Sequence, residues 1–336
     1  MREFGSDFHR LDGFVGTPLD IERLNPVTFA DGRLALIGLI QYKGWKRLWI
    51  PEYFCYEVVN SISHTGIELA FYPDGPEEDD RSLIKCIPFC KGDALLRMNY
   101  FGLRAWRDES ELPVDVIEDH SHGLLTDWAQ HSNADYCIAS LRKIMPIPEG
   151  GILWSPRRHI LPCLSESTVA NDNLVYKRFA AMSLKAIYIN SGGDKGEFRR
   201  LYIESEKELE VLRLSGMSVF NKQLYSMFDY RTFDSLKKNN WHYLTSLLTE
   251  DVCFLIPENN VDTPFSLILR FADKVSCSVV RSKLIENSIY PAILWPIPEE
   301  HKCDKRIYLS IHCDGRYSFD DMEIIATIIN RIYRNE

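Results

Sequence analysis

The chain has 336 residues, of which 45% are hydrophobic and 26% are charged, as expected for a globular protein with one large or two medium-sized domains. Its net charge of −9 argues against nucleic acid as a partner, because phosphate backbones attract a basic surface. No run of about 18 uncharged apolar residues is present, so we expect no membrane span.

The first half of the chain alternates helical and strand patterns. Residues 32–43 have helical periodicity and begin at a glycine, and residues 52–66 form a second predicted helix that ends at Gly66, a typical C-cap. The predicted strands are residues 47–51, 67–73, 93–102, 114–119, 134–140 and 150–155. Strands interleaved with helices predict a mostly parallel sheet with helices on both faces and ligands at the carboxyl ends of the strands.

The second half begins with helices and ends with a mixed pattern. Residues 165–250 are rich in helical patterns, and a polar segment at 190–200 interrupts them as an expected mobile loop. Strands are predicted at 265–272 and 306–312, and an amphipathic helix follows the expected N-cap Ser318. We therefore expect an α/β protein with three parts. These are a large domain at 1–165, a helical connector that completes it at 166–250, and a small α+β domain at 251–336.

The first residues and the cysteines indicate a cytoplasmic protein. The start, MREFGSDFHRLDGF, lacks the apolar core of a secretion signal. The nine cysteines are odd in number and scattered, which indicates reduced thiols and no disulfide framework. Cys86 and Cys90 are close in sequence, but no second pair of zinc-type ligands lies nearby.

Two carboxylates and two imidazoles follow one predicted strand, in the segment IEDHSHGLL at 117–125. A metal site formed by Asp119, His120 and His122, a catalytic dyad and a cofactor clamp are all open at this point. Glu118 and His120 have the opposite strand parity to Asp119, so one or both can face the other side of the sheet as ordinary polar residues.

A lysine lies at the end of another predicted strand, in SLRKIMPIPEGGILW at 140–154. A single lysine is normally a solvated surface charge. At a strand end in a cleft, however, partial desolvation would lower the pKa of Lys143 and favour the neutral, nucleophilic amine. The two glycines that follow Glu149 permit a close approach of the backbone.

Several segments, taken in order along the chain, resemble the DegT/StrS-type sugar aminotransferases, which are fold-type-I enzymes dependent on pyridoxal phosphate. Lys143 lies six residues before Glu149, as in the family's cofactor-lysine segment, and VIEDHSHG resembles its IEDAAQAHG-type segment. The other matching segments are residues 31–40, 49–72, 287–298 and 308–329. The resemblance implies a fold-type-I architecture, with a mostly parallel sheet in the large domain and a small C-terminal α+β domain.

The resemblance also implies catalytic roles. Lys143 matches the lysine that bonds covalently to pyridoxal phosphate and moves protons during the reaction. Asp119 matches the aspartate that keeps the pyridine nitrogen protonated, which makes the ring an electron sink. His122 matches a glutamine or histidine near the phenolic oxygen of the cofactor.

The cofactor phosphate is expected at a helix start. Gly32 and Arg33 open the first helix, whose free N–H groups suit a phosphate. The family usually has a threonine at the second position, and Arg33 either adds charge there or points to solvent. Ser140 matches the phosphate-binding serine, although Lys143 is the third residue after it where the family usually has the lysine as the fifth. Arg142 would compensate with a charge-assisted contact.

The remaining implied contacts are weaker. Tyr53 is the aromatic residue that we expect to stack on the cofactor ring, although aromatic residues at helical spacing are commonly core residues. Asn99 and Tyr100 end a strand at the cleft and are expected to contact the substrate. We expect no metal ligand set. The family also implies a homodimer with active sites at the subunit interface.

The implied activity is transamination. An amino acid, by family habit glutamate, would give its amino group to a keto group on a nucleotide-linked sugar, in the synthesis of surface polysaccharides or antibiotic sugars. The alternatives are another pyridoxal-dependent reaction, a non-catalytic binding or scaffold protein of the same fold, and a simple phosphate-binding α/β protein. Sugar dehydratases of this fold lack the lysine, so Lys143 argues against that reaction.

Overall fold

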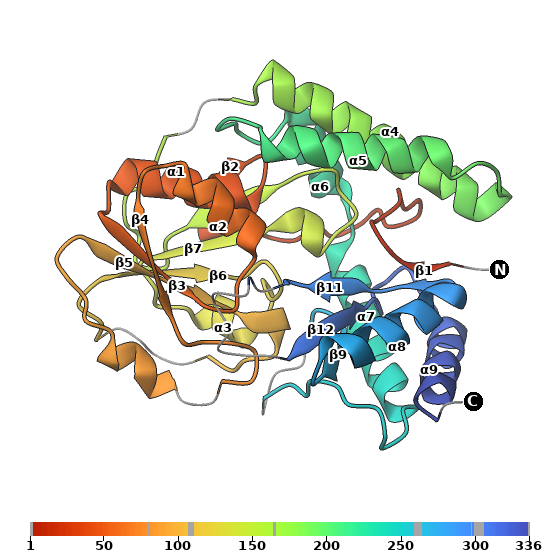
Figure 1. Cartoon of the computed structure of the whole chain (residues 1–336). Helices are drawn as coiled ribbons and strands as arrows, with labels where there is room; N and C mark the ends of the chain where they lie inside the picture. Colours follow the sequence, from red (N-terminus) through yellow and green to blue (C-terminus); the bar gives the residue numbers. More distant parts are fainter. Residues whose placement is uncertain are drawn as a thin grey trace.

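The structure is a computed structural model, and its largest element is a seven-stranded sheet (Figure 1). The described residues are 3–78, 81–106, 111–163, 166–258, 264–296, 298 and 306–334. The strands of the large sheet are β2 (Val27–Phe29), β3 (Arg47–Pro51), β4 (Glu68–Tyr72), β5 (Asp93–Met98), β6 (Asp115–Asp119), β7 (Tyr136–Ser140) and β8 (Gly151–Trp154). Their spatial order is β2-β8-β7-β6-β5-β3-β4.

All neighbouring strands from β7 to β4 are parallel, and β8 is antiparallel to both of its neighbours. The helices of the described chain are α1 (Gly32–Lys43), α2 (Tyr56–Ser63), α3 (Asp127–His131), α4 (Val169–Ser191), α5 (Gly196–Glu210), α6 (Val219–Met227), α7 (Tyr230–Ser246), α8 (Lys274–Glu286) and α9 (Phe319–Tyr333). Figure 1 shows α4 and α5 side by side as a long helical hairpin.

A second, smaller core lies in the C-terminal part. Its antiparallel sheet has the order β11-β12-β9, formed by β11 (Ala292–Leu294), β12 (Ile307–Ile311) and β9 (Leu267–Phe271). Helices α7, α8 and α9 pack against it. The N-terminal strand β1 (Phe4–Gly5) pairs in parallel with β10 (Ile289–Tyr290), so the first described residues join the C-terminal part.

The predicted fold class is confirmed, including the mostly parallel sheet and the smaller C-terminal α+β part. The predictions at 32–43 and 47–51 match α1 and β3 residue for residue. Ser318 caps α9 as predicted, in a reciprocal capping box with Asp321. The limits of the three domains stay predictions, and residues 1, 165 and 336 lie outside the described chain.

Three element boundaries differ from the sequence prediction. The helix predicted at 52–66 is shorter, because Cys55 has extended backbone angles and α2 begins after it. The strand predicted at 93–102 ends at Met98 and is followed by a 3-10 turn. The loop predicted at 190–200 was wrong for its second half, since α5 begins at Gly196 and packs along α4 through buried apolar residues.

None of the described helices has the length and hydrophobicity that a membrane crossing requires. Eight cysteines have free thiols, in agreement with the expectation of no disulfide framework, and the ninth, Cys303, lies outside the described residues.

Glu149 ties the start of β8 to two helices. Its carboxylate is 1% exposed and accepts hydrogen bonds from the Asn171 side chain on α4 and from the backbone N–H of Ser218, the N-cap of α6, both at 2.7 Å. Burial raises the pKa of Glu149 to about 7, although both hydrogen bonds oppose this shift. The folded state therefore binds the Glu149 proton more tightly than the unfolded state does.

This raised pKa predicts a pH-dependent stability. The contribution of Glu149 is complete below its unfolded pKa of about 4.3 and is lost as the pH rises through its folded pKa of about 7. Between pH 5 and pH 7, the wild type should lose about 2 kcal/mol of unfolding free energy relative to Glu149→Gln, which does not titrate. Urea unfolding of both proteins at each pH measures the difference. Equal changes in the two proteins would contradict the assignment.

Candidate active site

Neighbouring strand ends bring the predicted residues to one edge of the large sheet. Strands β6 and β7 are parallel neighbours that end at Asp119 and Ser140. On the other side of β6, the Asn99 N–H donates to the Asp119 carbonyl at 3.0 Å. Lys143 ends a 3-10 turn, Leu141–Lys143, directly after β7. The predicted pair of Asp119 and Lys143 therefore lies on two adjacent strand ends of one sheet.

Asp119 is a buried carboxylate with one oxygen bound. Its side chain is 8% exposed, and Oδ1 accepts the backbone N–H of Ser121 at 2.8 Å. Among the described residues, no cationic side chain lies within ion-pair distance of this carboxylate. A buried carboxylate is stabilised by a charged or hydrogen-bonding partner, so Asp119 can accept a further N–H from a ligand.

His122 lies inside an aromatic cluster. Its ring stacks with Phe101, Phe265 and Trp295, at centroid distances of 5.5, 4.4 and 5.2 Å. The side chain is 2% exposed, and Nδ1 has no hydrogen-bond partner. Burial and then the charge of Lys143 hold the pKa of His122 well below its usual range, so the imidazole is neutral at pH 7.

Lys143 borders a cavity of about 400 Å³, here called the Lys143 cavity. The amine is 5.7 Å from the centroid of the Trp295 ring, the same ring that stacks on His122. Other residues around the cavity are Ser6, Asp7, Arg142, Arg178, Phe265 and His312. Lys143 is half-buried at this wall, which gives a ligand in the cavity access to the amine.

Two arginines beside Lys143 share one carboxylate. Arg142 and Arg178 bind Glu206 at 3.2 and 2.5 Å, and their charges hold the pKa of Glu206 at about 2 although burial raises it. Nε of Arg142 and Nη1 of Arg178 are buried without a hydrogen-bond partner. This part of the site therefore has spare N–H donors for an anion.

Sequence reasoning missed Arg178 and Glu206. Both lie on the α4–α5 hairpin, in the region expected to be a connector. The helical pattern predicts the helices, but it does not indicate which polar face meets the strand ends. Arg178 lies four residues after Leu174, and both are buried on the same face of α4, which the sequence pattern alone does not reveal.

The start of α1 is packed tightly against β7 and is capped by a carboxylate. A Cβ atom on Gly32 would lie 3.1 Å from Cβ of Ser140. Asp31 is the N-cap and accepts the Leu34 N–H at 2.7 Å. Arg33 donates to the Leu209 carbonyl at the end of α5 and lies 3.4 Å from the Asp31 carboxylate, so its guanidinium is directed to α5 and not to solvent.

Tyr53, Asn99 and Tyr100 do not line the Lys143 cavity. Each is at most 1% exposed. The Tyr53 hydroxyl donates to the Leu294 carbonyl at 2.6 Å, and the Tyr100 hydroxyl donates to the Tyr53 carbonyl at 2.6 Å. Asn99 donates to the Thr126 hydroxyl at 2.9 Å. Their polar groups thus have partners within the fold. Ring stacking by Tyr53 and substrate contacts by Asn99 and Tyr100 stay predictions.

Glu118 and His120 lie in a separate buried network. The imidazole Nε2 is 3.0 Å from a Glu118 oxygen, and Arg97 lies 3.6 Å from the other oxygen. The ligand atoms of Glu118, His120 and Cys137 lie within 4.8 Å of one another. Among the described residues, this is the group of three side chains that is compact enough to hold a metal ion. The alternative set of Asp119, His120 and His122 is not such a group. The Glu118 oxygens are already bound by protein groups, so this cluster serves as a core network.

Comparisons with known proteins give structural matches alone. No protein-family model and no curated protein matches the sequence. Spr1654 from Streptococcus pneumoniae, a candidate sugar aminotransferase solved in its PMP form, superposes with a TM-score of 0.63 at 12% identity, over 96% of this chain and 94% of that chain.

Two further solved structures agree with this match. Helicobacter pylori PseC, an aminotransferase involved in the biosynthesis of pseudoaminic acid, superposes with a TM-score of 0.62 at 12% identity over 100% of both chains. A DegT DnrJ EryC1 StrS aminotransferase from Brucella abortus gives 0.59 at 12% identity, over 93% of this chain and 87% of that chain. The chain therefore has the fold of the DegT/DnrJ/EryC1/StrS aminotransferases, the fold-type-I architecture.

Proposed function

We propose that the protein is a pyridoxal-phosphate-dependent aminotransferase that moves an amino group from an amino acid to a keto sugar. The observation that carries the proposal is the arrangement of the Lys143 amine and the Asp119 carboxylate on adjacent strand ends, in a chain with the fold of sugar aminotransferases. We further propose glutamate as the donor, a nucleotide-linked sugar as the acceptor, a homodimer as the assembly and the cytoplasm as the location.

The phosphate end of the cofactor fits the cationic side of the site. The start of α1 offers backbone N–H groups beside Ser140, and Arg142 and Arg178 have buried N–H groups without partners. Phosphate oxygens would satisfy these donors. Unsatisfied buried donors cost about 1–3 kcal/mol each, so a ligand that binds them is favoured.

The ring end would lie beside Asp119 and Lys143, which come from neighbouring strand ends. A planar aromatic group, the Trp295 indole, already stacks on His122 and lies 5.7 Å from the Lys143 amine. A cofactor ring stacked on His122 would take the place that the Trp295 indole now occupies. Asp119 would then hold a proton on the ring nitrogen through its uncommitted oxygen.

The residues of this chain would divide the chemistry. Bound pyridoxal phosphate would supply the electron sink that makes the α-proton of an amino acid removable. Lys143 would take that proton and return it on the neighbouring carbon. Asp119 would keep the ring protonated. His122, neutral and fixed by stacking, would orient the ring without adding charge.

A non-catalytic binding protein of the same fold is the second candidate. The carboxylates of Asp31 and Glu206 lie at or near the start of α1, where they would repel a phosphate. The Arg142 and Arg178 side chains oppose that repulsion by pairing with Glu206. If transamination holds, the roles of the structural neighbours favour a pathway that makes amino sugars, for surface polysaccharides or antibiotics.

The first test concerns Lys143 as the residue that bonds covalently to the cofactor. Borohydride reduction of the protein with pyridoxal phosphate should fix the cofactor covalently to the peptide that contains Lys143, because only an amine at the cavity wall can bond to it. Mass spectrometry of the digest locates the label. Lys143→Ala should abolish turnover, whereas Lys177→Ala, on the outer part of α4, should retain both label and turnover. A label on another lysine would contradict the assignment.

The second test concerns Asp119. Asp119→Asn keeps the shape of the side chain but removes the negative charge. The rate at which glutamate converts the bound cofactor to its amino form should fall at least a hundredfold, about 2.7 kcal/mol of activation free energy. Stopped-flow absorbance of the cofactor measures this rate. A near-normal rate would show that Asp119 serves only to hold the Ser121 turn.

The third test separates transamination from simple binding. Glutamate alone should remove the visible band of the bound cofactor and release about one equivalent of 2-oxoglutarate per site, because the amino group must reside on the cofactor between the two substrates. A keto-sugar nucleotide should restore the band. A protein that binds the cofactor but does not respond to any amino acid would favour the non-catalytic candidate.

A further inference from the structure

Trp295 of the C-terminal part lies over the ends of four neighbouring strands of the large sheet. Its indole is next to side chains that follow β3, β5, β6 and β7, which are consecutive in the sheet. The distances from its ring centroid to neighbouring ring centroids are 5.7 Å to Tyr53, 5.9 Å to Phe54, 5.8 Å to Phe101 and 5.2 Å to His122. Ligands of parallel sheets bind beyond the carboxyl ends of the strands. The indole therefore fills a place where a ligand is expected.

The indole interacts with two residues that the proposed function assigns to the cofactor. It stacks on His122, with the two ring planes 20° apart. The Lys143 amine lies 5.7 Å from the indole centroid, and aromatic faces attract cations. Tyr53, the aromatic residue expected to stack on the cofactor, lies beside the indole as well. The indole and a cofactor ring at this place exclude each other, because both need the same face of His122.

The backbone of Trp295 has a conformation that the local sequence disfavours. Its φ angle is 42°, in the left-handed region, where the Cβ atom of an L-residue crowds the backbone. The next residue is Pro296, and a proline pushes the residue before it toward extended backbone with negative φ. The contacts of the indole must offset this strain. A ligand that takes over the face of His122 would leave Trp295 able to return to extended backbone.

Trp295 is the first residue after a fixed part of the chain. Strand β11 ends at Leu294, which pairs with Tyr308 of β12. The Leu294 carbonyl also accepts the Tyr53 hydroxyl at 2.6 Å. Trp295 lies beyond this ladder and is half-buried, and Pro296 after it is exposed. A rotation of the backbone at Trp295 can therefore move the indole without disturbing β11.

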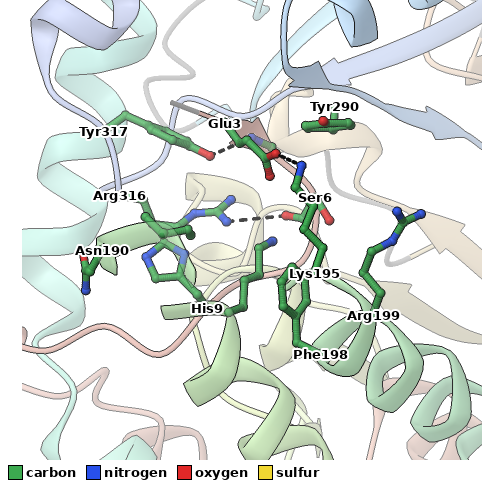
Figure 2. A pocket seen from close by; sticks show the side chains of 13 residues that line it. Glu3, Ser6, His9, Asn190, Lys195, Phe198, Arg199, Tyr290, Arg316 and Tyr317 are labelled. Carbon is green, nitrogen blue, oxygen red and sulfur yellow. Dashed lines mark hydrogen bonds and ion pairs between the residues drawn. The ribbon is translucent and has the colours of Figure 1, made fainter. Parts of the chain in front are cut away.

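The other end of the same segment is fixed by the N-terminal residues. Strand β10 pairs with β1, and Tyr290 borders both the Lys143 cavity and a second cavity of about 360 Å³ (Figure 2). At this second cavity, Figure 2 shows Lys195 bound to Glu3, and Arg316 donating to the Ser6 carbonyl. A movement of the whole C-terminal part would break these contacts, whereas a rotation at Trp295 leaves them intact.

We propose that Trp295 is a gate for the cofactor. Its indole fills the ring place beside His122 and Lys143, and it leaves this place when the pyridoxal ring enters. The inference rests on the proposed function for the identity of the ligand. Only molecules with a displaced indole can bind, so the gate lowers the apparent affinity by the fraction of such molecules. Cofactor binding is thereby coupled to a change of backbone at the end of β11.

The first measurement is the affinity of the full chain for pyridoxamine phosphate. This form has no aldehyde and cannot bond to lysines, so equilibrium dialysis measures binding apart from catalysis and covalent attachment. Trp295→Ala should bind it about tenfold more tightly than the wild type or better, which corresponds to an indole in place in about nine of ten wild-type molecules. Trp295→Phe keeps a ring that can stack on His122, and its affinity should stay close to that of the wild type.

Trp106→Ala is the matched control. Trp106 is 38% exposed and lines neither cavity, so its loss should leave the affinity unchanged. Thermal unfolding verifies that all three variants fold. A side chain that only fills space predicts the opposite sign for Trp295→Ala, because a hole in the packing would weaken binding or leave it unaltered.

The second measurement follows the indole in the wild type and needs no variant. Hydroxyl-radical footprinting with mass spectrometry reports the exposure of individual tryptophans. Addition of pyridoxamine phosphate should increase the oxidation of Trp295 severalfold, because the displaced indole enters solvent. The oxidation of Trp106, which is exposed already, should not change.

Two results would overturn the inference. They are an affinity of Trp295→Ala equal to or weaker than that of the wild type, and an oxidation of Trp295 that does not rise when the ligand binds. The proposed function is tested separately, by the reaction of the wild-type protein with glutamate. If that reaction fails while Trp295→Ala binds more tightly, the gate stands and transamination does not. If the reaction succeeds while the two affinities are equal, transamination stands and the gate does not.

Discussion

A close backbone contact that requires glycine holds the candidate site together. A Cβ atom on Gly151 would lie 2.1 Å from the backbone carbonyl at the start of α1, a distance that no side chain can adopt. The adjacent Gly150 N–H donates to the Ala30 carbonyl at 2.7 Å, and its carbonyl accepts the Leu141 N–H at 2.8 Å. The first residues of β8 thus fix the helix start that suits a phosphate relative to the turn that bears Lys143.

The electrostatics of the site follow from this packing. The strand ends, the start of α1 and the α4–α5 hairpin converge at the site, and residues with opposite charges meet there. The carboxylates at this place neutralise only part of the positive charge. Glu206 pairs with two arginines, and the Lys185 amine donates to the backbone carbonyl of Asp7. Partial neutralisation leaves the protein able to bind anions without a strongly basic overall charge. For this reason the net charge of the whole chain argues against a nucleic-acid surface, but it does not predict whether small anionic ligands bind.

The sequence predicted the parts of the fold that local patterns determine. Hydrophobic periodicity predicted α1 and β3 with correct ends. Because parallel strands end at the same edge of a sheet, the sequence also predicted that Asp119 and Lys143 lie at one edge. It could not predict contacts made by packing between distant elements. Tyr53 satisfied an aromatic pattern but lies in the core, and Arg178 reaches the site only because α4 packs across it. Side-chain direction on a helix depends on the tertiary partner, which a pattern does not contain.

The N-terminal segment closes the site from the far end of the sequence. The Gly5 N–H donates to the hydroxyl of Tyr317, 312 residues away, and a Cβ atom on Gly5 would lie 2.3 Å from the Tyr290 carbonyl. During synthesis, domains fold from the N-terminus onward while the ribosome is still adding residues. The partners of these first residues are therefore synthesised only when nearly the whole chain is complete. Both cavities therefore take their final shape only when residues from both ends of the sequence have been synthesised and have packed together.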